Sequence, residues 1–395
     1  GLGVLNTIVV TTALPSGFHS YVTNVGVKDS SQDFTVVASD RPCAGSGVFT
    51  QSRFAGPSVV ISRSHVADLA AQAVVVISKN ANVATGAEGT RNAEEITRGV
   101  AARLGLNEQD VLIASTGVIG RQYPIENIRA GIAGLPSPLP DNDAEEVARG
   151  IMTTDTVHKI ASATVAGSSA RIVGVAKGVG MIEPNMATLI AMVFTDAAIE
   201  PQLLDSTFRS VINRTLNCVS VDTDTSTSDT AIILANGAAG SVDIAAFETA
   251  LHEVLLHLTK SIARDGEGAE TLIEVLVDNA RDTEQAKTVA KAIVNSPLVK
   301  TAVHGADPNW GRVAMAVGKC SQYTDIDQEK VVIRFGTQEV YPTQVNESGL
   351  AQLSEYMRGA DVTIHVSLAT GTSSATVWGC DLTDGYVRIN ADYTT

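Results

Sequence analysis

The chain has 395 residues, of which 44% are hydrophobic and 18% charged, so it is long enough for two or three lobes and too apolar for a disordered protein. Its formal net charge of −15 disfavours nucleic-acid binding, because no stretch supplies the basic surface that phosphates require. No apolar run reaches the roughly 18 residues of a membrane span, and residues 1–17 lack the basic region of a signal peptide.

The cysteines indicate the compartment. They are widely spaced and form no C-x-x-C pair: Cys43, Cys218, Cys320 and Cys380. Such scattered cysteines are typical of structural thiols in a reducing environment. We therefore expect a cytoplasmic protein without a disulfide framework.

Strands and helices alternate in the first part of the chain. An apolar run predicts a strand over 73–78, helical spacing predicts a helix over 92–106, and a second strand follows over 111–115. The proline-rich stretch 135–146 has the composition of a surface loop.

The middle of the chain is predicted to contain a buried strand whose first residue is Thr188. The run Thr188 to Phe194 is apolar after its first residue and follows a loop with Glu183, Pro184 and Asn185. β-branched residues are common in strands, so the pattern alone predicts only a threonine at a strand edge.

The second half continues the alternation. A strongly amphipathic helix is predicted over 243–266, with Asp243 as its N-cap and Gly266 as its stop. Further elements are a strand over 271–277, a helix over 283–297, and strands over 331–335, 362–368 and 386–390. This order predicts a mixed α/β fold.

Metal-binding patterns are weak. His252 and His257 are five residues apart, whereas two helical zinc ligands need a spacing of four to share a face, so both are expected to be solvated. Asp222 and Asp224 resemble the start of a calcium loop, but the required glycine and closing glutamate are missing.

No other cofactor or hydrolase motif is complete. The chain has no dinucleotide fingerprint, P-loop or nucleophile elbow. His365 is expected at the surface. His304 precedes Asp307 and Asn309 in a loop that is either functional or a turn held by their side chains.

A threonine nucleophile needs no histidine when it is the first residue of a chain. Its own α-amine, with a pKa near ~7.7–8.0, can then accept the hydroxyl proton. For Thr188 this chemistry requires prior cleavage of the bond that precedes it.

Several motifs together resemble the ornithine acetyltransferase (glutamate N-acetyltransferase) family of arginine biosynthesis. They occur in the family's order over nearly the whole chain: STGVIG (115–120), IMTTDT (151–156), AKGVGMIEPNMATL (176–189), DTDTSTSDTA (222–231), DGEGA (265–269), KTAVHGADPNWGRVAMAVG (300–318) and INADYTT (389–395). The resemblance implies layered helices and sheets and an (αβ)2 heterotetramer.

The resemblance also implies a self-cleaving precursor. An N→O acyl shift would break the bond between Ala187 and Thr188, giving an α chain of 1–187 and a β chain of 188–395. Thr188 would then move the acetyl group of N2-acetylornithine to glutamate by a ping-pong route, without a metal or cofactor.

The family's functional positions carry over to residues of suitable chemistry. Thr116 and Gly117 would form the oxyanion hole, which stabilises the charge that develops in acyl transfer. Substrate contacts would come from Thr153, Lys177, Thr188, Glu267, Asn390 and Thr395. Without the motif context, Lys177 and Glu267 would be read as exposed charges in glycine-rich loops.

Three motifs depart from the common arginine-pathway pattern. These are Arg121-Gln122-Tyr123, His304-Gly305-Ala306, and Asp222-Thr223-Asp224 with Ser228. The variants look closer to the ornithine acetyltransferase-like enzymes of clavulanic acid gene clusters, which leaves open a secondary-metabolite pathway, a different acyl donor and the use of acetyl-CoA. Two rival functions also remain: a threonine-nucleophile aminopeptidase or amidase, and a non-catalytic binding homologue.

Overall fold

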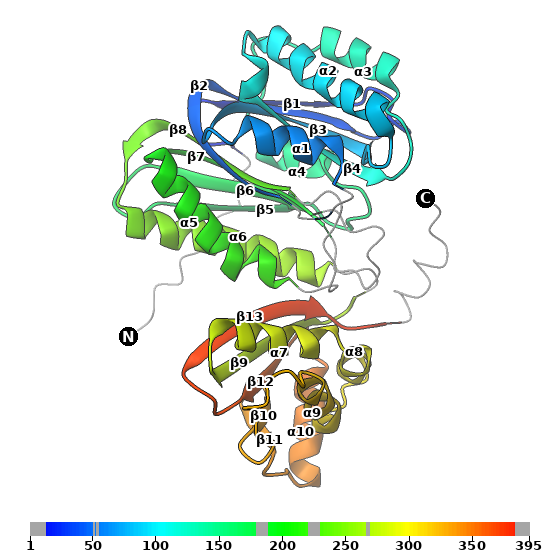
Figure 1. Ribbon diagram of the computed structural model, residues 1–395, viewed down its shortest axis with the longest axis vertical. Helices are drawn as coiled ribbons and strands as arrows, with labels where there is room; N and C mark the ends of the chain where they lie inside the picture. Colours follow the sequence, from blue (N-terminus) through cyan, green and yellow to red (C-terminus); the bar gives the residue numbers. More distant parts are fainter. Residues whose placement is uncertain are drawn as a thin grey trace.

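The computed structural model describes residues 13–49, 52, 55–178, 189–219, 230–265 and 269–383. These residues form a mixed α/β fold with an eight-stranded and a five-stranded sheet, so the predicted fold class is confirmed. Figure 1 shows the larger sheet and its helices above the smaller sheet, with α6 (Ile244–Arg264) between the two.

The larger sheet follows the order β4-β3-β2-β8-β7-β6-β5, with β1 paired to β2. Its strands are β1 (Phe18–Thr23), β2 (Phe34–Phe49), β3 (Ala70–Asn80), β4 (Val111–Val118), β5 (Lys159–Thr164), β6 (Arg171–Lys177), β7 (Ile190–Ala198) and β8 (Thr230–Ser241). The long strand β2 pairs mainly through its first half with β3 and through its second half with β8. It therefore connects two layers of the sheet, one formed by β1–β4 and the other by β5–β8.

The two layers pack face to face. Alternate residues of β3 and β4 share one apolar core with alternate residues of β6, β7 and β8. At its centre the rings of Phe18 and Phe194 lie 5.4 Å apart. This inner core brings strands of opposite layers together although they are far apart in the sheet order.

Helices cover both outer faces. Helices α1 (Pro57–His65), α2 (Gly86–Leu104) and α3 (Ile125–Ala133) pack on β2–β4, whereas α5 (Pro201–Arg214) and α6 pack on β5–β8. The short α4 (Ala144–Gly150) packs into the inner core. The result is a helix–sheet–sheet–helix arrangement of four layers (Figure 1).

The smaller sheet has the order β11-β10-β12-β9-β13. Its elements are β9 (Leu272–Ala280), α7 (Thr283–Asn295), α8 (Pro297–His304), α9 (Trp310–Gly318), β10 (Val332–Phe335), β11 (Gln338–Tyr341), α10 (Glu347–Met357), β12 (Asp361–Ser367) and β13 (Ser373–Cys380). Its helices and strands share one apolar core. The bridge between Val219 and Trp378 links this part to the larger one.

Most predicted elements are confirmed. The structure has strands β3, β4, β7, β9, β10 and β12 and helices α2, α6 and α7 at the predicted places. Asp243 caps α6, since its side chain accepts a hydrogen bond from the backbone N–H of Ala246. The expected strand over 386–390, the stop at Gly266 and the strand start at Thr188 lie outside the described residues.

The prediction of a surface loop over 135–146 is wrong in part. Leu135 and Leu139 are buried in the core under α2 and α3, because their apolar side chains pack there away from water. Asp143 caps α4 by accepting hydrogen bonds from the N–H groups of Glu145 and Glu146. The acidic end of this stretch is therefore a helix start.

All four cysteines are buried free thiols, as predicted for structural cysteines. Burial raises the pKa of Cys43 to about 12, so its thiolate is not available at neutral pH. Within the described residues, no helix is long and apolar enough to cross a membrane.

Candidate active site

The alternation of strand side chains places two predicted site residues opposite each other. On β4, Leu112 and Ala114 face the inner core, so Thr116 continues on that face. On β6, Val173 and Val175 do the same, and Lys177 follows them. Both side chains consequently point into the space between the two sheet layers.

Lys177, at the end of β6, contacts a residue of β4 and a residue of the loop after α4. Its Nζ donates hydrogen bonds to Thr116 Oγ1 and to Thr153 Oγ1, each at 2.7 Å. Lys177 is 3% exposed and Thr116 is fully buried, so their contact is shielded from water, whereas the contact with Thr153 is partly buried. The structure thus brings together Lys177, Thr116 and Thr153, which the sequence predicted as site residues.

Gly117 occupies a backbone conformation that requires glycine. Its φ is +132°, and a Cβ there would lie 2.3 Å from the carbonyl carbon of Lys79 and 2.5 Å from the backbone N of Asn80. The pairing of β3 with β4 is irregular at this point, since Asn80 lies opposite both Thr116 and Val118. The close strand approach fixes the backbone at the predicted oxyanion hole.

A buried ionic cluster lies beside Lys177. Lys159 is buried, and its Nζ donates to Asp155 Oδ2 at 2.6 Å and to Asp265 Oδ2 at 2.7 Å. Asp265 also accepts a hydrogen bond from the backbone N–H of Thr156 at 3.0 Å. This cluster joins the loop after α4, the start of β5 and the end of α6.

Sequence reasoning did not single out these three residues. Asp155 lies in the motif at 151–156, and Asp265 is the first residue of the motif at 265–269. The motifs therefore contained both carboxylates, although neither was predicted as a site residue. Lys159 lies in neither motif, and its position at the start of β5 gave no sign of an ion pair. Only the fold shows that the three charges meet.

Asp155 links the ionic cluster to Lys177. Its Oδ2 accepts a hydrogen bond from the backbone N–H of Gly178 at 3.0 Å. Burial alone would raise the pKa of Asp155, but the positive charges of Lys177 and Lys159, together with hydrogen bonds from Gly178 and Lys159, outweigh burial and lower it. Two lysines and the two carboxylates of Asp155 and Asp265 therefore form a balanced buried charge group.

Five predicted residues lie outside the described residues: Ala187, Thr188, Glu267, Asn390 and Thr395. The described neighbours of Thr188 and Glu267 lie beside residues of the site. Lys177 pairs with Ile190 across β6 and β7, and the N–H of Thr230 donates to Leu189 O at 2.9 Å. Asp265, which precedes Glu267 by two residues, binds Lys159.

The loop around His304 is a structural turn. Asn309 caps α9 by accepting a hydrogen bond from the N–H of Arg312, and its Nδ2 donates to Asp307. His304 itself ends α8, with Nδ1 3.2 Å from Asp381 Oδ2. The structural alternative for this motif is therefore confirmed.

His304, Glu270 and Asp381 also form the group of potential metal ligands that the described residues contain. The other oxygen of Asp381 accepts hydrogen bonds from the N–H groups of Glu270 and Thr271, each at 2.9 Å. Buried Lys300 lies nearby, where burial lowers its pKa, and its Nζ donates to Cys380 O at 2.6 Å. The carboxylate of Asp381 thus already has protein partners.

The other histidines are less exposed than expected. His252 and His257 are half-buried on α6, and burial lowers the pKa of each, because their helix packs on both sheets. His365 is also half-buried, with Nε2 2.8 Å from Asp278 Oδ2. The prediction of solvated imidazoles at these positions is therefore confirmed only in part.

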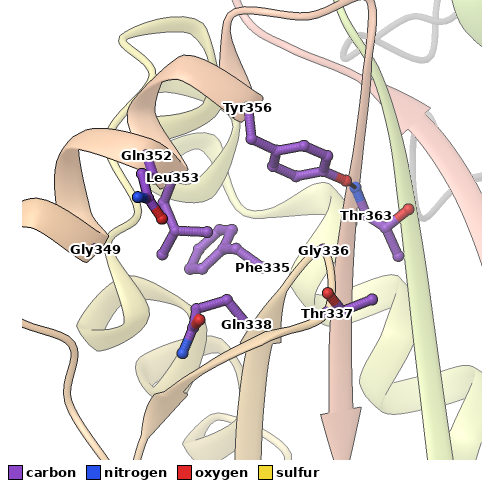
Figure 2. Close-up of a pocket in the computed structure, with 9 residues that line it drawn as sticks. All are labelled: Phe335, Gly336, Thr337, Gln338, Gly349, Gln352, Leu353, Tyr356 and Thr363. Atoms are coloured by element: carbon purple, nitrogen blue, oxygen red, sulfur yellow. Dashed lines mark hydrogen bonds between the residues drawn. The ribbon is translucent and has the colours of Figure 1, made fainter.

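Two cavities lined by described residues lie away from this site. One of about 450 Å³ lies between the β10–β11 turn and α10, where Figure 2 shows the ring of Tyr356 above Thr363. Tyr356 Oη accepts a hydrogen bond from the N–H of Thr363 at 2.9 Å. A second cavity of about 530 Å³ adjoins the stacked rings of Trp310 and Tyr341. Neither contains a predicted site residue.

Known proteins resemble this chain over almost its full length. The model of the ArgJ family matches residues 19–395. The arginine biosynthesis bifunctional protein ArgJ 2 of Nostoc sp. is 57% identical over 384 residues, which cover 97% of this chain and 99% of the relative. The glutamate N-acetyltransferase Oat2 of Streptomyces clavuligerus is 56% identical over 391 residues, which cover 98% and 99%.

Among solved structures, the arginine biosynthesis bifunctional protein ArgJ of Bacillus halodurans is 40% identical, with a TM-score of 0.48, and covers 51% of this chain and 98% of its own. The match of the family model and the two full-length relatives confirm the resemblance that the motifs indicated. The chain belongs to the ArgJ family.

Proposed function

We propose that the chain is a self-processing acetyltransferase that moves the acetyl group of N2-acetylornithine to glutamate through an ester on Thr188. Its family contains the 56%-identical glutamate N-acetyltransferase Oat2, which supports acetyl transfer as the chemistry. The observation that carries the proposal is the contact of the Lys177 ammonium with Thr116, buried between the two layers of the larger sheet, and with Thr153 beside it.

The position of β7 supports Thr188 as the nucleophile. Ile190 pairs with Lys177, and Ile190, Met192 and Phe194 all face the inner core. Thr188 precedes Ile190 by two residues, so the proposal requires it on the same face as Lys177. The buried strand β7 would then provide a rigid support for the nucleophile.

The proposed reaction has three steps. The Thr188 hydroxyl first attacks the carbonyl of Ala187, and the C–N bond between the two residues breaks, which gives an ester and frees the α-amine of Thr188. Water then hydrolyses this ester, which leaves the carboxylate of Ala187 and restores the Thr188 hydroxyl. The free α-amine then takes the proton as the hydroxyl attacks the acetyl carbon, the C–N bond breaks, and ornithine leaves with the proton on its amine. Finally the amine of glutamate attacks the ester, the C–O bond breaks, and the Thr188 hydroxyl is restored.

The described residues have distinct proposed roles. Thr116 and Gly117 would donate hydrogen bonds to the oxyanion of each tetrahedral intermediate. The positive charge of Lys177 would favour the neutral, proton-accepting form of the Thr188 amine or bind a substrate carboxylate. Thr153 would line the same pocket.

The remaining substrate contacts follow from the family. Glu267 would pair with a substrate ammonium and Asn390 with either pole of the amino acid, and Thr395 would line the same pocket. This reaction is balanced without a metal or a redox cofactor. We accordingly propose none.

The proposed chains 1–187 and 188–395 share one sheet. β6 of the first pairs with β7 of the second, and β2 pairs with β8, so cleavage would leave the two chains interleaved. We propose that they remain together and associate as an (αβ)2 heterotetramer in the cytoplasm. Size-exclusion chromatography with light scattering would measure the mass of the assembly.

Processing is tested on a denaturing gel with wild type beside Thr188→Ala. The wild type should give two bands, each near half of 41.1 kDa, and the variant one full-length band. Cys218→Ala is the control. It changes a buried residue outside the proposed site and should still give two bands. A wild type that stays full-length after long incubation would refute Thr188 as the nucleophile.

Acetyl transfer is tested by the acceptor. With N2-acetylornithine as donor, acetylglutamate should form only when glutamate is present, and ornithine should appear in equal amount. Consumption of the donor at the same rate without glutamate, with free acetate as the product, would instead identify an amidase.

A further inference from the structure

A chain of buried hydroxyl groups lies directly behind the predicted oxyanion hole. Ser115 precedes Thr116 on β4 and points to the opposite face, toward α1 and the outer core. Its Oγ is hydrogen-bonded to Ser58 Oγ at 2.9 Å and to Tyr123 Oη. All three side chains are buried.

Two buried asparagines hold the adjoining loops. Asn80 accepts a hydrogen bond from the N–H of Asn82 at 2.8 Å and donates one from Nδ2 to Gln122 O at 3.1 Å. Asn82 donates from Nδ2 to Gly89 O at 3.0 Å and accepts from Thr85 Oγ1 at 2.8 Å. The bond from Asn80 to Gln122 ties the end of β3 to the segment after β4, and the other bonds hold the segment between β3 and α2.

The backbone between these contacts is strained. Lys79, Asn82 and Ala84 have φ values of +78°, +53° and +59°, and Gly117 has +132°. Non-glycine residues in this region cost about 1–3 kcal/mol each, and they persist only where surrounding contacts hold them. The hydrogen bonds of Asn80 and Asn82 are contacts of that kind.

The network also includes two residues that the proposed chemistry leaves unused. Gln122 and Tyr123 follow directly after the motif at 115–120 and Arg121. Gln122 Nε2 donates to Thr85 O at 2.7 Å, and its backbone O accepts from Asn80. Tyr123 is buried among the apolar side chains of the outer core. Such a network is rigid only when its polar groups are satisfied.

We infer that Tyr123 and Asn80 are positioning residues that hold Thr116 and Gly117 in donating geometry through Ser115 and the β3–β4 irregularity. The inference rests on the proposed function, because it assumes that these two residues stabilise an oxyanion. Neither Tyr123 nor Asn80 acts on the substrate. Each acts by fixing the backbone on which the donors lie, where a displacement of about 1 Å can cost about 10²-fold in rate.

The test compares Tyr123→Phe with Ser62→Ala. Tyr123→Phe removes one hydroxyl and leaves Ser115 and Ser58 bonded to each other, so the fold should persist. Ser62 is one turn along α1 from Ser58, and its hydroxyl donates to Ile113 O and accepts from Ile113 N, at 2.5 and 2.8 Å. The control therefore removes a buried contact of α1 with β4 further from Thr116.

The readouts are kcat and KM for donor and acceptor, and the melting temperature. Tyr123→Phe should lower kcat about ten- to hundredfold with KM nearly unchanged, since the donors act in the transition state. Ser62→Ala should lower the melting temperature at least as much and leave kcat within about twofold. Equal kcat values for Tyr123→Phe and wild type would overturn the inference.

A second variant covers Asn80. Asn80→Ala should lower kcat in the same way, and in combination with Tyr123→Phe the losses should be less than additive because both act on one pair of donors. Additive losses would overturn the shared role. Failure of the proposed function gives a different result, since the wild type itself would then form no acetylglutamate.

Discussion

Lys177 Nζ lies 2.7 Å from Thr116 Oγ1, although the two residues are on strands of opposite sheet layers. Thr153 Oγ1 accepts a second hydrogen bond from the same ammonium. The contact joins the two layers at one end and fixes the hydroxyl of Thr116 relative to β6. Because Lys177 pairs with Ile190, it also fixes this hydroxyl relative to the start of β7. A nucleophile at Thr188 would need this relationship to meet its oxyanion donors.

The first prediction is that Lys177 and Thr116 act as one unit. Thr116→Ala should lower kcat/KM by ~10²–10³ if its hydroxyl donates to the oxyanion. Lys177→Met should also lower it, and the double variant should lose less than the sum of the two free energies because they share a hydrogen bond. Steady-state kinetics of the four proteins gives the coupling energy.

Lys287→Met is the control for loss of a lysine charge. Lys287 lies on α7, its Nζ contacts Asn213 at the end of α5, and its removal should leave kcat/KM unchanged. Strictly additive losses for Thr116 and Lys177 would contradict the prediction that they act together.

The sequence predicted the elements better than their arrangement. Periodicity located β4, β7 and the amphipathic α6, because each buries one face or both. It did not predict that Thr116 and Lys177, 61 residues apart, would touch. Their contact depends on β2, which connects the two layers, and nothing in its composition predicts that pairing.

The ionic cluster was also beyond prediction from the sequence. Asp265 is 106 residues from Lys159, and a lysine at a strand start is usually solvated. The roles of Thr116 and Gly117 came from the family resemblance, and the structure adds a physical reason for glycine at 117. The roles of Thr188, Glu267, Asn390 and Thr395 stay predictions.

The second prediction concerns Gly117. In Gly117→Ala the new Cβ meets the backbone of Lys79 and Asn80, so β4 must shift where it carries the predicted oxyanion donors. We expect kcat to fall by ~10²–10³, the loss associated with one oxyanion donor. Stopped-flow measurement of acetyl-enzyme formation would show whether the loss is in the chemical step.

Gly105→Ala is the matched control. Gly105 ends α2 with φ +70°, and nothing lies within 4 Å of the position that a Cβ would take there. This variant should lose about 1 kcal/mol of stability from backbone strain and keep its kcat. A normal kcat for Gly117→Ala would show that the backbone at 117 has no part in the chemistry.

The third prediction concerns the stability that Lys159 provides. Lys159→Met leaves the carboxylates of Asp155 and Asp265 buried without their shared cation, so we expect a loss of about 3–5 kcal/mol in the free energy of unfolding. Urea denaturation followed by circular dichroism measures this loss. Lys300→Met is the comparison, because the Lys300 ammonium is equally buried but donates to a carbonyl. Its loss should be smaller, and the reverse order would contradict the buried ionic role of Lys159.

The fourth prediction is a pH dependence that arises from Asp155. Lys177 and Lys159 lower its folded-state pKa against the effect of burial, so the unfolded chain binds the proton more tightly. This stabilisation is fully present above the ordinary aspartate pKa of about 3.9 and is lost as the pH falls through the lower folded value. Unfolding free energies measured between about pH 6 and pH 2.5 should therefore fall less steeply in Asp155→Asn than in wild type below about pH 4.

Asp361→Asn, which removes a carboxylate exposed at the surface beside Arg264, should keep the wild-type slope, since such pairs contribute about 0–1 kcal/mol. Parallel curves for Asp155→Asn and wild type would show that Asp155 does not contribute to acid sensitivity.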